Sequence, residues 1–297
     1  MPSNRSAAWR SPVATERQVI TRADRRPIGV FDSGVGGLTV LSELRRRLPN
    51  ESTLYLGDNG RAPYGPRPAE EVRAFTAECV AWLLGQDVKL LVVACNTATA
   101  QALPLVREQA GVPVVGVVRP GAVAASAATR SGHVGVMATA GTVASGAYPA
   151  AIGEANAAVV VSQQACPTLV PLVEAGRVDG PEAEGEVRRY LEPMLAGDRQ
   201  IDTLLLGCTH YPLLRAAIQR VAGRAVAVVD SAFTTAIAVE DLLDALRART
   251  DRLASEANRI ATTGDVAAFS GVAERVFGDR LPDVESVSVE APLGLKA

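Results

Sequence analysis

The sequence predicts an α/β fold made of two similar α/β domains with mostly parallel sheets and an active site in the cleft between them. Three observations favour this fold. Short β-branched runs alternate with Ala-, Leu- and Arg-rich segments of helical period, many apolar runs end in small or polar residues, and one arrangement of strand and cysteine occurs twice. The first pattern is typical of parallel sheets covered by helices. The second places ligand-binding groups at the carboxyl ends of strands.

Composition excludes several classes of protein. The 297 residues include 30 Lys and Arg against 32 Asp and Glu, a formal net charge of −2, and 48% of them are hydrophobic. This composition excludes disorder for the bulk of the chain, and its balanced charge argues against a nucleic-acid partner. The apolar runs are shorter than the roughly 18 residues of a membrane span. We therefore expect a soluble protein with no membrane partner.

Residues 1–26 differ from the rest of the chain. They are polar, carry six Arg against Glu16 and Asp24, and lack the apolar core of a secretory signal. We expect a disordered tail, or the product of an over-extended start site. Enrichment in Arg and Ser also leaves a transit peptide open.

The remaining elements follow in order along the chain. Buried strands are expected where short apolar runs end in small or polar residues, at 28–31, 53–56, 90–94, 114–118, 134–137, 203–206 and 226–229. Helical periods at 72–84, 97–107 and 212–221 predict helices. Domain boundaries are expected near Arg119-Pro120-Gly121 and near Asp230-Ser231. The predicted first domain is thus 27–119 plus 230–297, and the second is 120–229.

The repeated arrangement indicates an internal duplication. A strand that ends at Asp32-Ser33 is followed by one that ends at Cys95, and a strand that ends at Ala138-Thr139 is followed by one that ends at Cys208. The simplest architecture has two similar units that face each other. Each unit then places one cysteine at the carboxyl end of a strand, where ligands bind.

The four cysteines divide into two pairs. None has C-x2-C spacing, so we expect free thiols in a reducing compartment. Cys79 lies in a helical stretch and Cys166 precedes a proline, and we interpret both as inert packed thiols. Cys95 and Cys208 each lie between a strand and a predicted helix, where backbone amides lower a thiol pKa from about 8.5 toward neutrality. The alternative is that each small side chain only fills a strand end.

Two thiols on facing units predict proton transfer at both faces of a carbon. Inversion of a stereocentre by deprotonation needs a base on one side and an acid on the other, and a thiolate with a thiol supplies both. The α-hydrogen of an amino acid is weakly acidic, so donors must also stabilise the carbanion that forms. The predicted donors are hydroxyl and amide groups in the same turns, on Ser33, Asn96, Thr97 and Thr209.

Three other features leave alternatives open. The turn after the first strand has Thr39 where the third glycine of a dinucleotide motif belongs, so an anion-binding turn is favoured over a nucleotide site. Asp32 either caps a helix, binds a substrate ammonium or assists the nearby thiol. His210 either assists Cys208 or is scaffolding, and His133 is expected to face solvent. A metal site is disfavoured because no ligand spacing supports one.

Four motifs resemble those of the glutamate racemase family, part of the aspartate/glutamate racemase superfamily. They are the runs DSGVGGLTV from Asp32, GD with PYG at Gly57 and Pro63, ACNTATA from Ala94, and GCTHYPL from Gly207. The resemblance extends from about Pro27 to about Asp265. It implies a cofactor-independent racemase with two α/β domains, the second inserted into the first.

The resemblance also implies roles for individual residues. Cys95 corresponds to the base for D-glutamate and Cys208 to the base for L-glutamate, assisted by Asp32 and His210 respectively. Asp58 and Glu174 correspond to supporting acidic residues. The positions that correspond to substrate-binding residues are Asp32, Ser33, Tyr64, Gly65, Asn96, Thr97, Thr142, Thr209 and His210.

By the same resemblance, the expected product is D-glutamate for peptidoglycan, cell-wall biogenesis and cell shape, made in the cytoplasm by a homodimer with no cofactor or metal. Other functions share the scaffold but are disfavoured. A single-thiol decarboxylase would not need both thiols, and the run from Thr209 to Pro212 resembles the glutamate branch more than an aspartate or hydantoin racemase. A two-lobed binding protein would use the cysteines only for packing.

Overall fold

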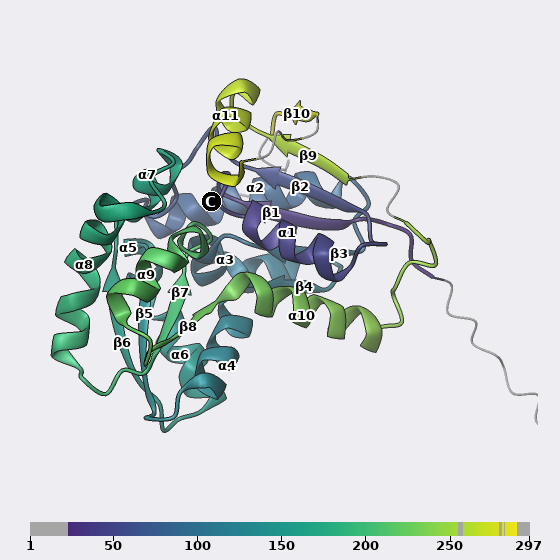
Figure 1. The fold of residues 1–297 in the computed structure, drawn as a ribbon. Helices are drawn as coiled ribbons and strands as arrows, with labels where there is room; N and C mark the ends of the chain where they lie inside the picture. Colours follow the sequence, from purple (N-terminus) through teal and green to yellow (C-terminus); the bar gives the residue numbers. More distant parts are fainter. Residues whose placement is uncertain (1–22, 255–257, 279–280, 282, 290–297) are drawn as a thin grey trace, which may run out of the picture.

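In the computed structural model, which describes residues 23–254, 258–278, 281 and 283–289, the chain forms two parallel sheets covered by helices (Figure 1). The predicted tail falls mostly on residues 1–22, and these lie outside the described residues. None of the described helices is long and apolar enough to span a membrane.

The larger sheet has six strands in the order β10-β9-β2-β1-β3-β4. These strands are β1 (Ile28–Asp32), β2 (Thr53–Gly57), β3 (Leu90–Val93), β4 (Val114–Gly116), β9 (Asn258–Thr262) and β10 (Val284–Ser286). All neighbours are parallel, and β1 lies between β2 and β3. The carboxyl ends of β1 and β3 therefore meet at the same edge, which brings Asp32 and Cys95 together.

The smaller sheet has four parallel strands in the order β6-β5-β7-β8. They are β5 (His133–Ala138), β6 (Val160–Ala165), β7 (Thr203–Gly207) and β8 (Ala227–Asp230). As β1 pairs with β3, so β5 pairs with β7. The predicted repetition of a strand pair with a cysteine after its second strand is confirmed.

Helices cover both faces of each sheet. In the first half of the chain they are α1 (Leu38–Arg47), α2 (Ala69–Leu84), α3 (Asn96–Gln109), α4 (Val118–Ala128), α5 (Ala140–Ala144) and α6 (Ala147–Ala155). In the second half they are α7 (Leu169–Glu174), α8 (Gly180–Gly197), the 3-10 helix η1 (Tyr211–Leu214), α9 (Arg215–Ala222), α10 (Ser231–Ala245) and α11 (Val266–Phe277).

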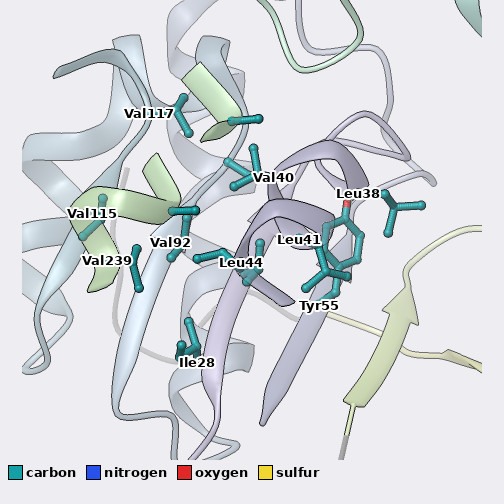
Figure 2. Close-up of a cluster of buried hydrophobic side chains, with 14 of the residues drawn as sticks. Ile28, Leu38, Val40, Leu41, Leu44, Tyr55, Val92, Val115, Val117 and Val239 are labelled. Carbon is teal, nitrogen blue, oxygen red and sulfur yellow. The ribbon is translucent and has the colours of Figure 1, made fainter. Parts of the chain in front are cut away.

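Successive side chains of a strand point to opposite faces of the sheet, so the larger sheet has a separate hydrophobic core on each face. On β1, Ile28 and Val30 pack against α1 and α10, whereas Phe31 packs on the opposite face with residues of α2 and α3. Figure 2 shows the first of these cores, in which Leu44 of α1 lies on the side of Val92 and Val239, and Leu41 of α1 lies beside Tyr55. Because α10 contacts both α1 and α4, it connects the helical layers of the two sheets.

Three local expectations need correction. The apolar run 114–118 is not one strand, because β4 ends at Gly116 and α4 begins at Val118. Arg119-Pro120-Gly121 therefore lies inside the first turns of α4 rather than between a strand and a helix, and a proline is tolerated in a first helical turn. The helix expected at 212–221 begins as η1 and becomes α-helical only at Arg215.

Candidate active site

Cys95 follows β3 and begins α3. Its side chain is 5% exposed, and its Sγ accepts a hydrogen bond from the Ala98 amide at 3.4 Å, as the N-cap of the helix. The sulfur lies 3.5 Å from Ser33 Oγ, with which it forms a hydrogen bond. The helix N-terminus therefore points its free amides at the sulfur, as the sequence predicts.

The pKa of Cys95 moves in the direction opposite to the one expected. Burial and the neighbouring carboxyl of Asp32 raise the pKa to about 12, and the hydrogen bonds with Ser33 and Ala98 only partly compensate. Burial in low dielectric disfavours the thiolate more than one helix N-terminus favours it. Cys95 is thus a neutral thiol at physiological pH.

Cys208 follows β7 and has a different set of neighbours. Its Sγ lies 3.9 Å from Nδ1 of His210, and Nε2 of the same ring lies 3.0 Å from Oε1 of Glu174. Burial lowers the pKa of His210, but its hydrogen bonds with Cys208 and Glu174 outweigh burial and raise the pKa to about 10. The ring is therefore a cation next to the sulfur.

Asp32, at the end of β1, lies near Cys95 and His210, with a side chain that is 0% exposed. Its Oδ2 accepts a hydrogen bond from the Gly34 amide at 3.0 Å, and its Oδ1 accepts one from Thr209 Oγ1 at 3.4 Å. Burial raises the pKa of this carboxyl, and the charge of His210 opposes the shift. Asp32 thereby links the turn after β1 to the loop that follows Cys208.

The glycine-rich turn after β1 packs against the loop that follows β7. A Cβ at Gly36 would lie 2.4 Å from Thr209 Oγ1 and 2.5 Å from His210 Nδ1. Thr39, in the same turn, donates to the Thr209 carbonyl at 3.0 Å. Glycine is needed at 36 because any side chain would displace His210.

A pocket of about 580 Å³ opens between the carboxyl ends of the two sheets. Its volume is in the range of small-molecule sites. Of the predicted site residues, those that line it are Ser33, Tyr64, Gly65, Cys95, Asn96, Thr97, Glu174, Cys208, Thr209 and His210. Asp32, Asp58 and Thr142 are fully buried and stand outside this lining. Both thiols thus face one space.

Hydroxyl and amide groups gather on the Cys95 side of the pocket. Thr97 Oγ1 lies 2.8 Å from Thr139 Oγ1 and 3.3 Å from Thr142 Oγ1. Asn96 accepts a hydrogen bond at Oδ1, from Tyr148, while its Nδ2 is buried without a partner in the described structure. These groups suit an anionic ligand with several oxygens.

Asp58 supports the loop that carries Tyr64. Its carboxylate accepts hydrogen bonds from Arg61 Nε at 2.7 Å, from Thr263 Oγ1 at 2.5 Å and from the Tyr64 hydroxyl. The Tyr64 hydroxyl therefore donates its proton to Asp58. The ring of Tyr64 is fully buried and lines the pocket.

Some lining residues were not predicted as site residues. Thr139 follows β5 as Ser33 follows β1, and that parallel identifies it as a candidate. Cys166 was interpreted as inert; it is fully buried but lines the pocket, and burial raises its pKa to about 12. Ala268 and Val272 come from α11. Small apolar residues on a late helix carry no local signal of a site.

The chain has extensive similarity to known proteins. A family model described as Asp/Glu/Hydantoin racemase matches residues 28–242. A glutamate racemase of Shouchella clausii is 46% identical over 272 residues, which are 92% of this chain and 98% of that protein.

Solved structures agree with these matches. Glutamate racemase isoform RacE1 from Bacillus anthracis is 44% identical with a TM-score of 0.85, over 90% of this chain and 98% of that one. A glutamate racemase from Francisella tularensis in complex with D-glutamate is 33% identical with a TM-score of 0.83, over 90% and 99% of the two chains.

Proposed function

This chain belongs to the Asp/Glu/Hydantoin racemase family, and on that premise we propose that it interconverts L-glutamate and D-glutamate by a cofactor-independent two-base mechanism. The observation that carries the proposal is that Cys95 and Cys208 face one pocket from different sheets. Curated relatives named glutamate racemase, at 42–48% identity over most of this chain, support glutamate as the substrate.

In the proposed reaction, each thiol acts on one face of the α-carbon. From L-glutamate, the Cys208 thiolate removes the α-proton, so that an S–H bond forms, the Cα–H bond breaks and its electron pair delocalises into the carboxylate. The Cys95 thiol then gives its proton to the opposite face, which yields D-glutamate and a Cys95 thiolate. From D-glutamate the two roles are exchanged.

The charges around the two thiols favour Cys208 as the base and Cys95 as the acid in the direction from L-glutamate to D-glutamate. The His210 cation, 3.9 Å from the Cys208 sulfur and held by Glu174, stabilises negative charge on that sulfur. Cys95 keeps its proton, because its pKa is raised to about 12. Asp32, between the two loops, would favour protonated Cys95 and attract the substrate ammonium.

The proposed substrate-binding groups have the chemistry that glutamate requires. Asn96 offers a buried Nδ2 without a partner, and the hydroxyls of Ser33, Thr97 and Thr209 surround the same pocket. Tyr64 and Gly65 form the wall near Thr139, and Thr142 holds Thr97 from behind. Asp58 acts through the Tyr64 loop.

The similarity to glutamate racemases supports a proposal for the cellular role. We propose that the enzyme supplies D-glutamate for peptidoglycan in the cytoplasm, and that it assembles as a homodimer. All four cysteines are free thiols, in keeping with a reducing compartment. We also propose that 27–119 plus 230–297, around the larger sheet, and 120–229, around the smaller sheet, are the two domains.

The test is proton NMR of purified protein in D2O with each glutamate enantiomer, alongside circular dichroism of the amino acid. α-Proton exchange with loss of optical activity from either enantiomer is expected. Exchange without inversion would show that only one base works. The absence of both exchange and inversion would reject the proposal. Aspartate and a hydantoin, run in parallel, test the substrates that the family description also names.

A further inference from the structure

The amide of Asn96 is held at one end and free at the other. Asn96 is the first residue of α3, next to Cys95, and it lines the pocket with a side chain that is almost fully buried. Its Oδ1 accepts a hydrogen bond of 2.6 Å from the Tyr148 hydroxyl. Its Nδ2 is buried and has no partner among the described residues. Buried donors without partners are rare and call for a ligand or another explanation.

Tyr148 reaches this amide from a helix that packs on the smaller sheet. It lies in α6, is fully buried, and its ring packs on Gly207, where a Cβ would lie 2.7 Å from Cε2. Gly207 directly precedes Cys208. The same tyrosine therefore contacts the strand end that carries one thiol and the helix start that carries the other.

The direction of the hydrogen bond from Tyr148 is determined by its surroundings. Burial raises the pKa of the phenol, so that it stays protonated and can donate. Asn96 Oδ1 is therefore the end of the amide that accepts from the protonated phenol, which leaves Nδ2 for the pocket. Ser231, at the start of α10, is a further side-chain neighbour of the phenol.

We infer that Tyr148 is a positioning residue, which fixes the Asn96 amide so that Nδ2 points into the pocket and donates to a substrate carboxylate. The inference rests on the proposed function, since a carboxylate substrate is what the donor would bind. Because Tyr148 and Asn96 come from helices that pack on different sheets, the donor is oriented only in the arrangement that also brings the two thiols to one pocket.

The test is Tyr148→Phe, which removes the hydroxyl and keeps the ring on Gly207. KM for both glutamate enantiomers should rise about 3- to 10-fold with kcat changed less than about twofold, because a binding contact is weakened in ground state and transition state alike. Asn96→Ala should raise KM further, by roughly 10- to 100-fold. The double variant should match Asn96→Ala, because Tyr148 acts only through the amide.

Tyr190→Phe is the matched control. The Tyr190 hydroxyl lies 2.9 Å from Thr168 Oγ1, and Tyr190 is not part of the pocket lining, so both kinetic constants should stay at the wild-type values.

An unchanged KM in Tyr148→Phe would overturn the inference, and so would additive effects in the double variant, which a purely structural role predicts. A folded wild-type protein without turnover would instead overturn the proposed function and this inference with it. If Tyr148→Phe does not fold, Asn96→Asp takes its place, because it keeps an acceptor for Tyr148 and removes the Nδ2 donor. Its KM should rise about tenfold or more, and a KM equal to the wild type would then overturn the inference.

Discussion

Cys95 and Cys208 stand at the same point of two similar strand pairs, yet their neighbours differ. Cys95 contacts the Ser33 hydroxyl and the Ala98 amide, with the Asp32 carboxyl close by, and its pKa is raised to about 12. A duplicated backbone has therefore not duplicated the environment of this thiol.

The Cys208 thiol has a histidine instead. His210 lies 3.9 Å from the sulfur, has a pKa raised to about 10, and contacts Glu174 on its other side. One thiol thus keeps a proton, while the other lies beside a cation that stabilises negative charge. Since two enantiomers have equal free energy, kcat/KM must be equal in both directions. The asymmetry can appear only in partial reactions and in pH profiles of kcat.

The largest expected effect comes from removing either thiol. Cys95→Ser and Cys208→Ser should each lower racemisation by roughly 10²- to 10⁴-fold, because proton transfer on one face is lost. Each variant should keep α-proton exchange with one enantiomer only, L-glutamate for Cys95→Ser and D-glutamate for Cys208→Ser. NMR in D2O measures both.

The control for the thiol variants is Cys79→Ala, a buried cysteine that is not part of the pocket lining, which should retain racemase activity. Exchange of the same enantiomer by both serine variants would contradict the assignment of one thiol to each face.

Removal of the cation next to Cys208 should have the second-largest effect. His210→Asn should lower kcat by roughly 100-fold, the scale for loss of one electrostatic partner. The pKa of His210 is raised to about 10, so the cation is present below that pH and is lost as pH rises through it. Wild-type kcat should fall near pH 10, and the variant should lack this limb. If the fall of kcat near pH 10 persists unchanged in His210→Asn, a group other than His210 causes it.

Asp32→Asn should separate activity from stability. We expect roughly tenfold lower activity, because an electrostatic partner of the site is lost. Burial raises the pKa of Asp32, so the folded carboxyl binds its proton more tightly than the unfolded one, and ionisation destabilises the fold as pH rises above the unfolded value. The variant should therefore melt about 2–4 °C higher at neutral pH, and this difference should vanish in acid.

Asp198→Asn is the control for the thermal melts, because its melting temperature should change in the opposite direction to that of Asp32→Asn. A hydrogen bond with His133 lowers the pKa of Asp198, so its ionised form stabilises the fold above the unfolded pKa, and the variant should melt lower at neutral pH. A melting temperature of Asp32→Asn below the wild type at every pH would show that Asp32 is a net stabilising residue.

The smallest effect is expected where α11 meets α7. Arg275 donates a hydrogen bond of 2.9 Å to the Glu174 carbonyl, and Glu174 holds His210, so this contact affects only the Cys208 side. Arg275→Met should raise KM roughly two- to threefold. Arg259→Met, which breaks an ion pair with Glu285 at the edge of the larger sheet, should leave KM unchanged. Equal changes in both variants would mean a general loss of stability.

Buried strands that end in polar residues are a local signal, and from it the sequence predicts the two sheets and the candidate thiols. Tyr64, Thr142 and Glu174 carry no such signal and are candidates only through the family resemblance. The sequence does not reveal β6, whose Ser and Gln residues are only partly buried at a sheet edge, or β9, which joins β2 from far along the chain. The predicted direction of the pKa shift of Cys95 is also wrong. A helix N-terminus can be inferred from sequence, whereas burial and a carboxyl 63 residues away are properties of the packed fold.

The wall contributed by α11 has a consequence for biosynthesis. Cys95 and Cys208 are synthesised before Ala268 and Val272 of α11. The strand β2 gains its partner β9 equally late. At roughly 5–20 residues per second, several seconds separate the second thiol from the helix that completes the pocket. During this interval the nascent chain carries both reactive sulfurs without a finished cavity, so the onset of catalysis is coupled to near-completion of translation.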